Sequence, residues 1–378
     1  MQKNEDDILE DWILYHSYLF GVNNLYIVDN NSNEESLIIL RKYEQHGLNV
    51  CQRPDYSKKG DYLYELIKQN ERTCDIAIPL DIDEFIAIVD IKNVSYDLKM
   101  DLVGKCLSFD YNYYIREYPQ ILTEAKTHTE VLEHFIKKGY LFGWKCSDNK
   151  QVITVTHEQC DHFFQKYCKV ILKTHPQTTI SCEKEQIVTY LEQIPKYGRY
   201  SFLYYLTSRN GEIDYESPIT EIKQFDLIDY EIKGKDNCNK KFFDPKKLLF
   251  LDHGNHHGRV DGLNHGDYMN TNLVLFHYHN RGVRKLIEKC RNDIIGLGYV
   301  KDINDKNELR ENIKKNVCGA HNIQTYMNYL TSGPQSLCSF DEDHVTIDHL
   351  SHKITELRSR GNLGRGNLGS PSAPLLLL

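Results

Sequence analysis

The chain of 378 residues is 40% hydrophobic and 26% charged, as is usual for a globular protein. Its 46 Lys and Arg residues against 54 Asp and Glu residues give a net charge of −8, which argues against a nucleic-acid-binding protein. No apolar run is long enough for a transmembrane segment, and the acidic start is unlike a signal peptide. The 11 cysteines form no C-x-x-C pair. We therefore expect a soluble cytoplasmic protein with reduced thiols, in a viral or host-cytosol setting, the alternative being a Golgi-type lumen if a membrane anchor lies upstream.

Helix and strand patterns alternate in short steps over residues 1–90. Apolar side chains recur at helical spacing from Ile8 to Phe20, with Asp6 or Asp7 placed to cap the helix and Gly21 placed to end it. The elements expected next are a strand over 25–28, a helix over 34–44, a weak strand over 48–51, a helix over 61–70 and a strand over 76–80. This alternation predicts an α/β protein with a mostly parallel sheet flanked by helices.

The rest of the chain has less regular patterns. The aromatic runs at 111–114 and 200–205, with Trp144, fit either core packing or ligand stacking, and we favour core. A strand is expected over 273–276 and a helix over 283–292. The predicted organisation is one domain over 1–299, a polar and partly helical extension over 300–358, and a disordered tail over 359–378 that contains Gly, Ser and Pro.

Two carboxylates, Asp81 and Asp83, directly follow the apolar strand predicted over 76–80. Residues i and i+2 of an extended backbone point to the same side. Ligands of open α/β sheets bind at the carboxyl ends of the strands. Paired oxygen ligands there suit Mg²⁺ or Mn²⁺, which can hold a diphosphate and neutralise its charge. We interpret the pair as metal ligands, the alternative being a solvated turn.

Two weaker signals lie at the same predicted edge of the sheet. Asp29 ends the strand predicted over 25–28, where a carboxylate can accept a hydrogen bond from a ribose or a base, or can simply form a turn. Lys59, in the basic pair Lys58-Lys59, is placed to meet a diphosphate, and a solvated basic pair is the alternative.

Histidines are dense late in the chain, at positions 253, 256, 257, 265, 277 and 279. Histidine is a frequent metal ligand and a frequent general base. No H-E-x-x-H motif occurs, so a metalloprotease has no support. The pattern by itself does not identify which histidine does chemistry.

Several motifs together resemble one enzyme family. The opening reads K-N-E, E-D-W-I-L-Y-H, G-V and D-N-N-S, and it is followed at 81–85 by D-I-D-E-F. The segment 277–281 reads H-Y-H-N-R. This combination is similar to glycosyltransferases of the family 2-like and family 92-like type. The likeness is close over residues 3–90 and patchy over 240–295.

The resemblance implies a GT-A fold, a nucleotide-sugar donor, a glycan or glycoprotein acceptor, and Mn²⁺ or Mg²⁺. It implies inverting hexosyl transfer, for which the general base is left open among Asp148, Glu158 and Asp161. The metal ligands that it implies are Asp81, Asp83 and His256, with His257 as the alternative to His256. The residues that it implies around the nucleotide sugar are Asn4, Glu5, Asp29, Lys59 and Asp81.

Two departures from the family pattern stand out. Relatives carry a strand before K-N-E, whereas this chain begins almost at Lys3, so either the strand is missing or another segment replaces it. Gly282 stands where the family usually has Ser. The rival interpretations are a degenerate, non-catalytic binding or structural protein and a nucleotidyltransferase.

Overall fold

The computed structural model describes residues 1–89, 96–139, 144–147, 180–209, 218–228, 240–298, 300–315, 317, 319–337, 345–360 and 375–378. Its chain divides into two compact units, one of Met1–Ile88 with Cys182–Leu378 and one of Val89–Ser181. This division differs from the prediction of a single domain over 1–299. The second unit is inserted into the first, and residues of the predicted extension belong to the first unit.

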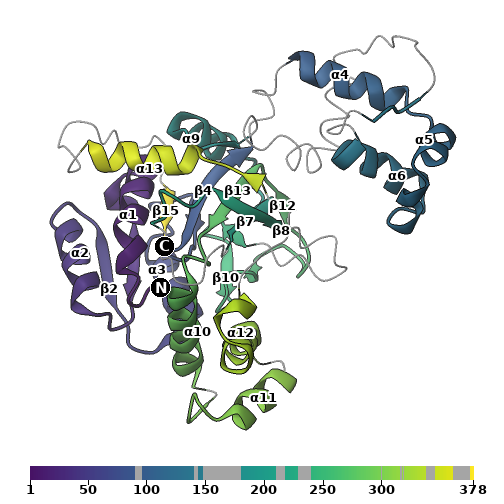
Figure 1. The fold of residues 1–378 in the computed structure, drawn as a ribbon. Helices are drawn as coiled ribbons and strands as arrows, with labels where there is room; N and C mark the ends of the chain where they lie inside the picture. The colour runs from purple at the N-terminus through teal and green to yellow at the C-terminus, as the bar shows by residue number, and fades with distance from the viewer. Residues whose placement is uncertain are drawn as a thin grey trace. The chain divides into compact units, whose positions relative to one another are not determined.

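The opening of the first unit follows the predicted order of elements (Figure 1). These elements are α1 (Asp6–Phe20), β1 (Tyr26–Asp29), α2 (Glu34–Glu44), β2 (Asn49–Gln52), α3 (Lys59–Gln69) and β3 (Ile76–Ile78). Gly21 ends α1 with a φ of 84°, a conformation that glycine adopts without strain. Capping by Asp6 or Asp7 was a wrong prediction, because both lie inside the first turn and Glu5 holds the N-cap position. Their negative charges still favour the N-terminal end of the helix dipole.

The later part of the first unit contributes most of the strands. They are β4 (Glu84–Val89), β6 (Arg199–Ser201), β7 (Tyr204–Ser208), β8 (Gln224–Ile228), β9 (Lys241–Phe243), β10 (Leu248–Leu251), β11 (Gly258–Val260), β12 (Met269–Asn270), β13 (Leu273–His277), β14 (Val345–Thr346) and β15 (Leu375–Leu377). The helices are α9 (Lys184–Gln193), α10 (Val283–Leu297), α11 (Lys306–Lys314), α12 (Ala320–Ser332) and α13 (His349–Ser359).

The sheets are mixed, so the α/β class is confirmed but the expectation of a mostly parallel sheet was wrong. One sheet has the order β12-β6-β9-β3-β15, and in another β14, β8, β7, β13 and β4 follow one another. Pairs β1–β2, β13–β7, β12–β6 and β15–β3 are parallel, but the other described pairs are antiparallel. Antiparallel neighbours need only a short connection, such as residues 252–257 between β10 and β11, whereas parallel neighbours need a longer crossover.

The last four residues correct the prediction of a disordered tail. Leu375–Leu377 form β15, which pairs in parallel with β3, and Leu377 also bridges to Leu25 at the start of β1. Consecutive leucines are apolar enough for a buried strand. A run this short has no periodicity, so its pattern did not predict the strand. The edge of β1 that does not face β2 therefore has neighbours, Leu377 beside Leu25 and Gln2 beside Asp29. Residues 361–374 lie outside the described residues.

The second unit is helical where it is described. It contains α4 (Tyr96–Leu107), α5 (Tyr111–Glu117), the short helix Pro119–Thr123, α6 (His128–His134), the turn Phe135–Gly139 and the strand β5 (Ile180–Ser181). Tyr114 is fully buried in a cluster with Val103, Val131 and Phe135. The Trp144 ring stacks on Tyr118 with centroids 4.4 Å apart and packs against this cluster. Tyr114 is core, as the sequence analysis favoured, and Trp144 is half-buried at the edge of its cluster.

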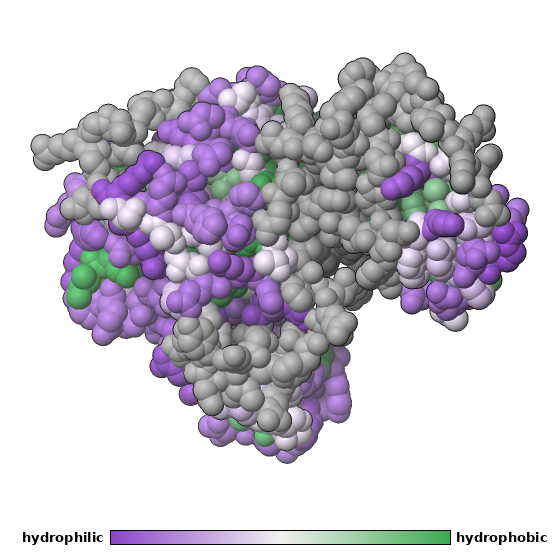
Figure 2. Space-filling view, turned by 45° about the horizontal axis from the view of Figure 1, so that its top comes forward, coloured by the Kyte–Doolittle hydropathy of each residue, from purple (hydrophilic) through white to green (hydrophobic). Residues whose placement is uncertain are grey.

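The surface of the described residues is mainly polar. The face drawn in Figure 2 is mainly hydrophilic, and its hydrophobic residues form small separate areas. Within the described part of the chain, no helix combines the length and the apolar character that crossing a membrane requires.

The core between α1 and β4 contains an imidazole. His16 is fully buried, and its ring lies near those of Trp12, Phe20 and Phe85, at centroid distances of 4.5, 6.3 and 5.5 Å. Its Nδ1 lies 3.0 Å from the carbonyl oxygen of Trp12. Burial lowers the pKa of His16 to about 3. The folded state therefore holds this ring neutral over a pH range in which an unfolded histidine takes up a proton.

This burial predicts an acid-sensitive core. The pKa of His16 in the folded state is below the unfolded value of about 6.5. The contribution of neutral His16 to the free energy of unfolding is therefore complete above pH 6.5. It is lost as the pH falls toward 3, by up to about 1.4 kcal/mol per pH unit. We expect His16→Phe to flatten the fall of the free energy of unfolding between pH 6.5 and 4, measured by urea unfolding. The exposed His46→Phe is the control. Parallel pH profiles for the wild type and His16→Phe would contradict this account.

Candidate metal centre

Strand pairing brings the D-x-D segment beside the late histidines. β3 ends at Ile78, Asp81 and Asp83 follow it, and β4 starts at Glu84. β4 pairs antiparallel with β13 in a register that sets His277 opposite Glu84. The backbone N–H of Tyr278 donates to the carbonyl oxygen of Asp83 at 2.8 Å. The ends of these two strands therefore place Asp83 next to the H-Y-H segment.

Three side chains at this point form a group that can hold a metal ion. One ligand atom each from Asp83, His277 and His279 lie within 4.8 Å of one another. His277 Nε2 is 3.4 Å from Asp83 Oδ2. The Nδ1 of His279 is buried and has no hydrogen-bond partner among the described residues. A carboxylate with two imidazoles is a common ligand set for divalent transition metals, so these residues fit a metal ion.

The protonation state of His279 suits this role. Burial, together with the nearby positive charge of Lys289, holds the pKa of His279 well below its usual value. The imidazole is therefore neutral at physiological pH. Metal binding requires a neutral imidazole with a free lone pair.

Asp83 is surrounded by positive charge. It is 2% exposed, Lys289 of α10 contacts its Oδ2, and Arg281 Nη1 lies 3.8 Å from the same oxygen. Burial opposes ionisation of Asp83, but Lys289, His277 and Arg281 outweigh it, so the pKa of Asp83 lies well below its usual range. The carboxylate is ionised under all physiological conditions, as a metal ligand must be.

Arg281 joins the start of the chain to this centre. Its Nε donates to Asp7 Oδ2 at 2.8 Å, its Nη1 donates to the Tyr278 carbonyl at 2.7 Å, and its Nη2 contacts Glu5. Burial raises the pKa of Glu5, with Arg281 and Lys289 acting in the opposite direction. Glu5, predicted at the nucleotide, therefore lies beside the metal centre as a partner of Arg281.

Asp81 has two buried lysines as partners. Lys59 Nζ lies 2.5 Å from Asp81 Oδ1, and Lys240 Nζ lies 2.6 Å from Oδ2. Lys240, just before β9, also bonds Glu84 Oε2 at 2.7 Å. Burial opposes ionisation of Asp81, but Lys240 and Lys59 outweigh it and hold its pKa well below the usual value. Lys59 thus lies at the carboxyl end of β3, as predicted, and there it pairs with Asp81.

The metal-ligand prediction is corrected in two of its three residues. Asp83 belongs to the group, whereas Asp81 and His256 do not. Asp81 is engaged by lysines, and His256 lies with His257 in the connection between β10 and β11. The other two members of the group, His277 and His279, were noted only among the late histidines and within the H-Y-H-N-R motif, and were not chosen as metal ligands. Their i, i+2 spacing at the end of a strand was the signal that could have found them.

Asn4 and Asp29 hold the nearby turns together. The Asn4 amide oxygen accepts a hydrogen bond from the backbone N–H of Asn33 at 2.8 Å. Asp29 is fully buried, and its oxygens accept from the Gln2 side chain and from the Ser32 N–H. Asp29 also lines a cavity of about 420 Å³, whose other lining residues are Asn31, Ser32, Leu37, Leu40, Arg41, Glu44, Val50 and Gln52. The base candidates Asp148, Glu158 and Asp161 lie outside the described residues.

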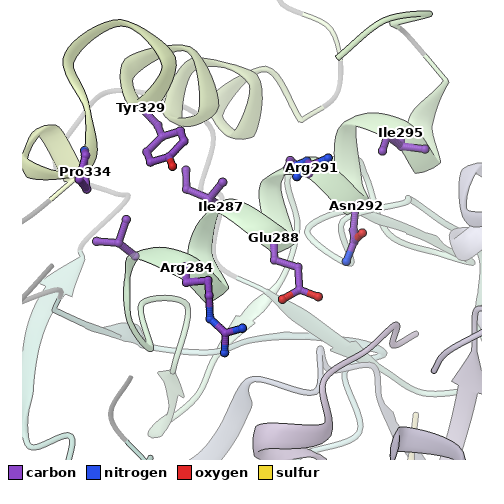
Figure 3. Close-up of a pocket in the computed structure, with 9 residues that line it drawn as sticks. Arg284, Ile287, Glu288, Arg291, Asn292, Ile295, Tyr329 and Pro334 are labelled. Carbon is purple, nitrogen blue, oxygen red and sulfur yellow. The ribbon is translucent and has the colours of Figure 1, made fainter. Parts of the chain in front are cut away.

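A second cavity, of about 600 Å³, lies along another face of α10 (Figure 3). Arg284, Glu288 and Asn292 of α10 line it together with Tyr329 and Pro334. Elsewhere on α10, Lys285 and Lys289 contact the carboxylates of Asp7 and Asp83. The helix thus separates the residues of this cavity from those of the metal centre.

Comparisons with protein-family models, with curated proteins and with solved structures found no match for this chain.

The lysine pairing of Asp81 and Glu84 yields a stability prediction. Removing one partner of a buried ion pair leaves an uncompensated charge, which costs about 3–5 kcal/mol. We expect Lys240→Met to lower the free energy of unfolding by that amount, measured by urea unfolding. Lys246, which pairs with Asp75 at the surface, provides the control Lys246→Met, which should change little. Equal effects of the two substitutions would rule out the buried network as a source of stability.

Proposed function

We propose that the protein is a metal-dependent glycosyltransferase that moves a sugar from a nucleotide-sugar donor to a hydroxyl acceptor. The observation that carries the proposal is the group formed by Asp83, the second carboxylate of the D-x-D segment, with His277 and His279 at the end of β13. Motifs in the same two regions underlie the resemblance to family 2-like and family 92-like glycosyltransferases.

The residues around this group suit a diphosphate leaving group. A divalent ion bound to Asp83, His277 and His279 supplies positive charge that stabilises a departing nucleoside diphosphate. Lys289 and Arg281 add fixed cations within contact distance of Asp83. Two imidazoles with one carboxylate favour Mn²⁺ over Mg²⁺, because Mg²⁺ prefers oxygen ligands.

The cavity beside Asp29 suits the nucleoside part of the donor. Its volume of about 420 Å³ is within the usual range for small-molecule sites. Arg41, Glu44 and Gln52 offer polar groups to a base or ribose, and Leu37, Leu40 and Val50 offer apolar surface. The proposal assigns the nucleoside to this cavity and the diphosphate to the metal centre.

A non-catalytic binding protein is the second candidate. The observation that favours it is the pairing of Asp81 with Lys59 and Lys240, which engages both oxygens of the carboxylate that the family resemblance assigns to ribose or metal. A transferase and a binding protein differ in whether bound nucleotide sugar is consumed.

The metal ligands can be tested by calorimetry. We expect Mn²⁺ to bind the wild type, and Asp83→Asn, His277→Ala and His279→Ala to weaken binding at least about tenfold, because each removes one of three ligands. His256→Ala is the matched control and should bind as the wild type does. Binding that depends on His256 and not on His279 would contradict the assignment.

The donor is tested next by thermal unfolding with UDP, GDP or CMP, with and without Mn²⁺. A nucleotide at about a hundred times its dissociation constant should stabilise the fold by roughly 2.7 kcal/mol, and Asp83→Asn should abolish the shift that requires Mn²⁺. Incubation of the stabilising nucleotide's sugar conjugates with hydroxyl acceptors then separates the two candidates. Release of the nucleoside diphosphate supports the transferase, and binding without release supports the binding protein.

A further inference from the structure

The C-terminal strand lies between two strands that carry residues of the candidate site. β1 pairs with β2 along one edge, and its other edge meets Leu377 at Leu25 and Gln2 at Asp29. β3 meets β9 at Ala77, and it pairs with β15 from Ile76 to Ile78. Residues 375–377 thus pair with β3, and Leu377 also bridges to Leu25, just before β1.

The side chains of this strand are part of the core. Leu376 and Leu378 belong to one cluster with Val28 of β1, Leu63 of α3 and Ala77 of β3. Leu377, which points to the opposite face by the alternation of a strand, is 1% exposed. Burying these leucines removes apolar surface from water, which stabilises the strand in its place.

The same strand holds the segment that leads into the carboxylates. The Leu378 N–H donates to the Ile78 carbonyl at 3.1 Å, and the Leu80 N–H donates to the Leu378 carbonyl at 2.8 Å. Pro79 between them has no N–H to donate. The Leu80 bond is therefore the first backbone bond that the chain donates after β3, and Asp81 follows at once.

The turn after Leu80 closes on itself. The Asp81 N–H donates to Glu84 Oε2 at 2.8 Å, and the Glu84 N–H donates to the Asp81 carbonyl at 3.0 Å. Asp83 lies inside this turn. The far end of the turn is held by the pairing of β4 with β13, and its near end is held by the bond between Leu80 and Leu378.

We propose that residues 375–378 are a positioning element of the metal centre, a parallel strand whose insertion between β1 and β3 fixes the turn from Leu80 to Glu84. The strand does not itself touch a metal ligand. It acts through the backbone of Leu80. This inference goes beyond the proposed function and rests on backbone contacts that hold whatever the site binds.

The test uses Leu377→Ala and Leu377→Asp in the full chain, with Leu249→Ala and Leu249→Asp as matched controls, since Leu249 is 45% exposed. We expect Leu377→Ala to lower the unfolding midpoint by at least about 4 °C. Exchange of the Leu80, Asp81 and Glu84 amide hydrogens, followed by NMR or mass spectrometry, should accelerate at least tenfold in Leu377→Ala. The Leu249 variants should change neither quantity by a comparable amount.

The outcomes separate this inference from the proposed function. Unchanged exchange of the Leu80 amide in Leu377→Ala and Leu377→Asp would overturn the positioning role, whether or not Mn²⁺ binds. Exchange that accelerates equally throughout the molecule, with no excess at residues 80–84, would also overturn the positioning role, because it would show only a loss of overall stability. Excess exchange at residues 80–84 supports it, even where the wild type fails to bind Mn²⁺ and the proposed function fails. Leu377→Ala keeps the test decisive where Leu377→Asp does not fold.

Discussion

The structure depends on pairing buried carboxylates with buried cations at one edge of its sheets. Asp83 forms ion pairs with Lys289 and Arg281, and Asp81 forms ion pairs with Lys59 and Lys240. A carboxylate removed from water without such a partner would be protonated or would destabilise the fold. The pairing keeps both carboxylates ionised in a place where ionisation would otherwise be unfavourable.

The cations come from segments that are distant in the sequence. Lys59 starts α3, Lys240 precedes β9, Arg281 follows β13, and Lys289 belongs to α10. β9 pairs with β3, α3 shares a core cluster with Ala77 of β3, and Arg281 and α10 follow β13 directly along the chain. The charge network therefore links the packing of the first unit to the chemistry of its candidate site. Replacing a lysine of α3 or α10 would therefore remove a positive charge from beside Asp81 or Asp83, which lie on other elements.

Local signals in the sequence predicted much of the opening of the fold. The helix over 34–44 coincides with α2, and the helix that runs to Phe20 ends at Gly21 as expected. These segments have apolar residues at clear helical spacing and capping or glycine residues at their ends. Both features depend on only a few neighbouring residues. Strand direction was predicted wrongly for the later sheets, because a short apolar run is the same in parallel and antiparallel pairs. The insertion of Val89–Ser181 as a separate unit had no local signal either.

For the candidate site, the sequence by itself determined the chemistry that is available: a D-x-D segment after a buried strand, and histidines spaced two apart in H-Y-H. Only the tertiary structure decided which of these groups meet. Pairing of β4 with β13 selected Asp83, His277 and His279, and the lysines from α3 and β9 engaged Asp81. The physical reason is that residue types are fixed by local sequence, whereas distances between them are set by strand register and helix packing across the whole chain.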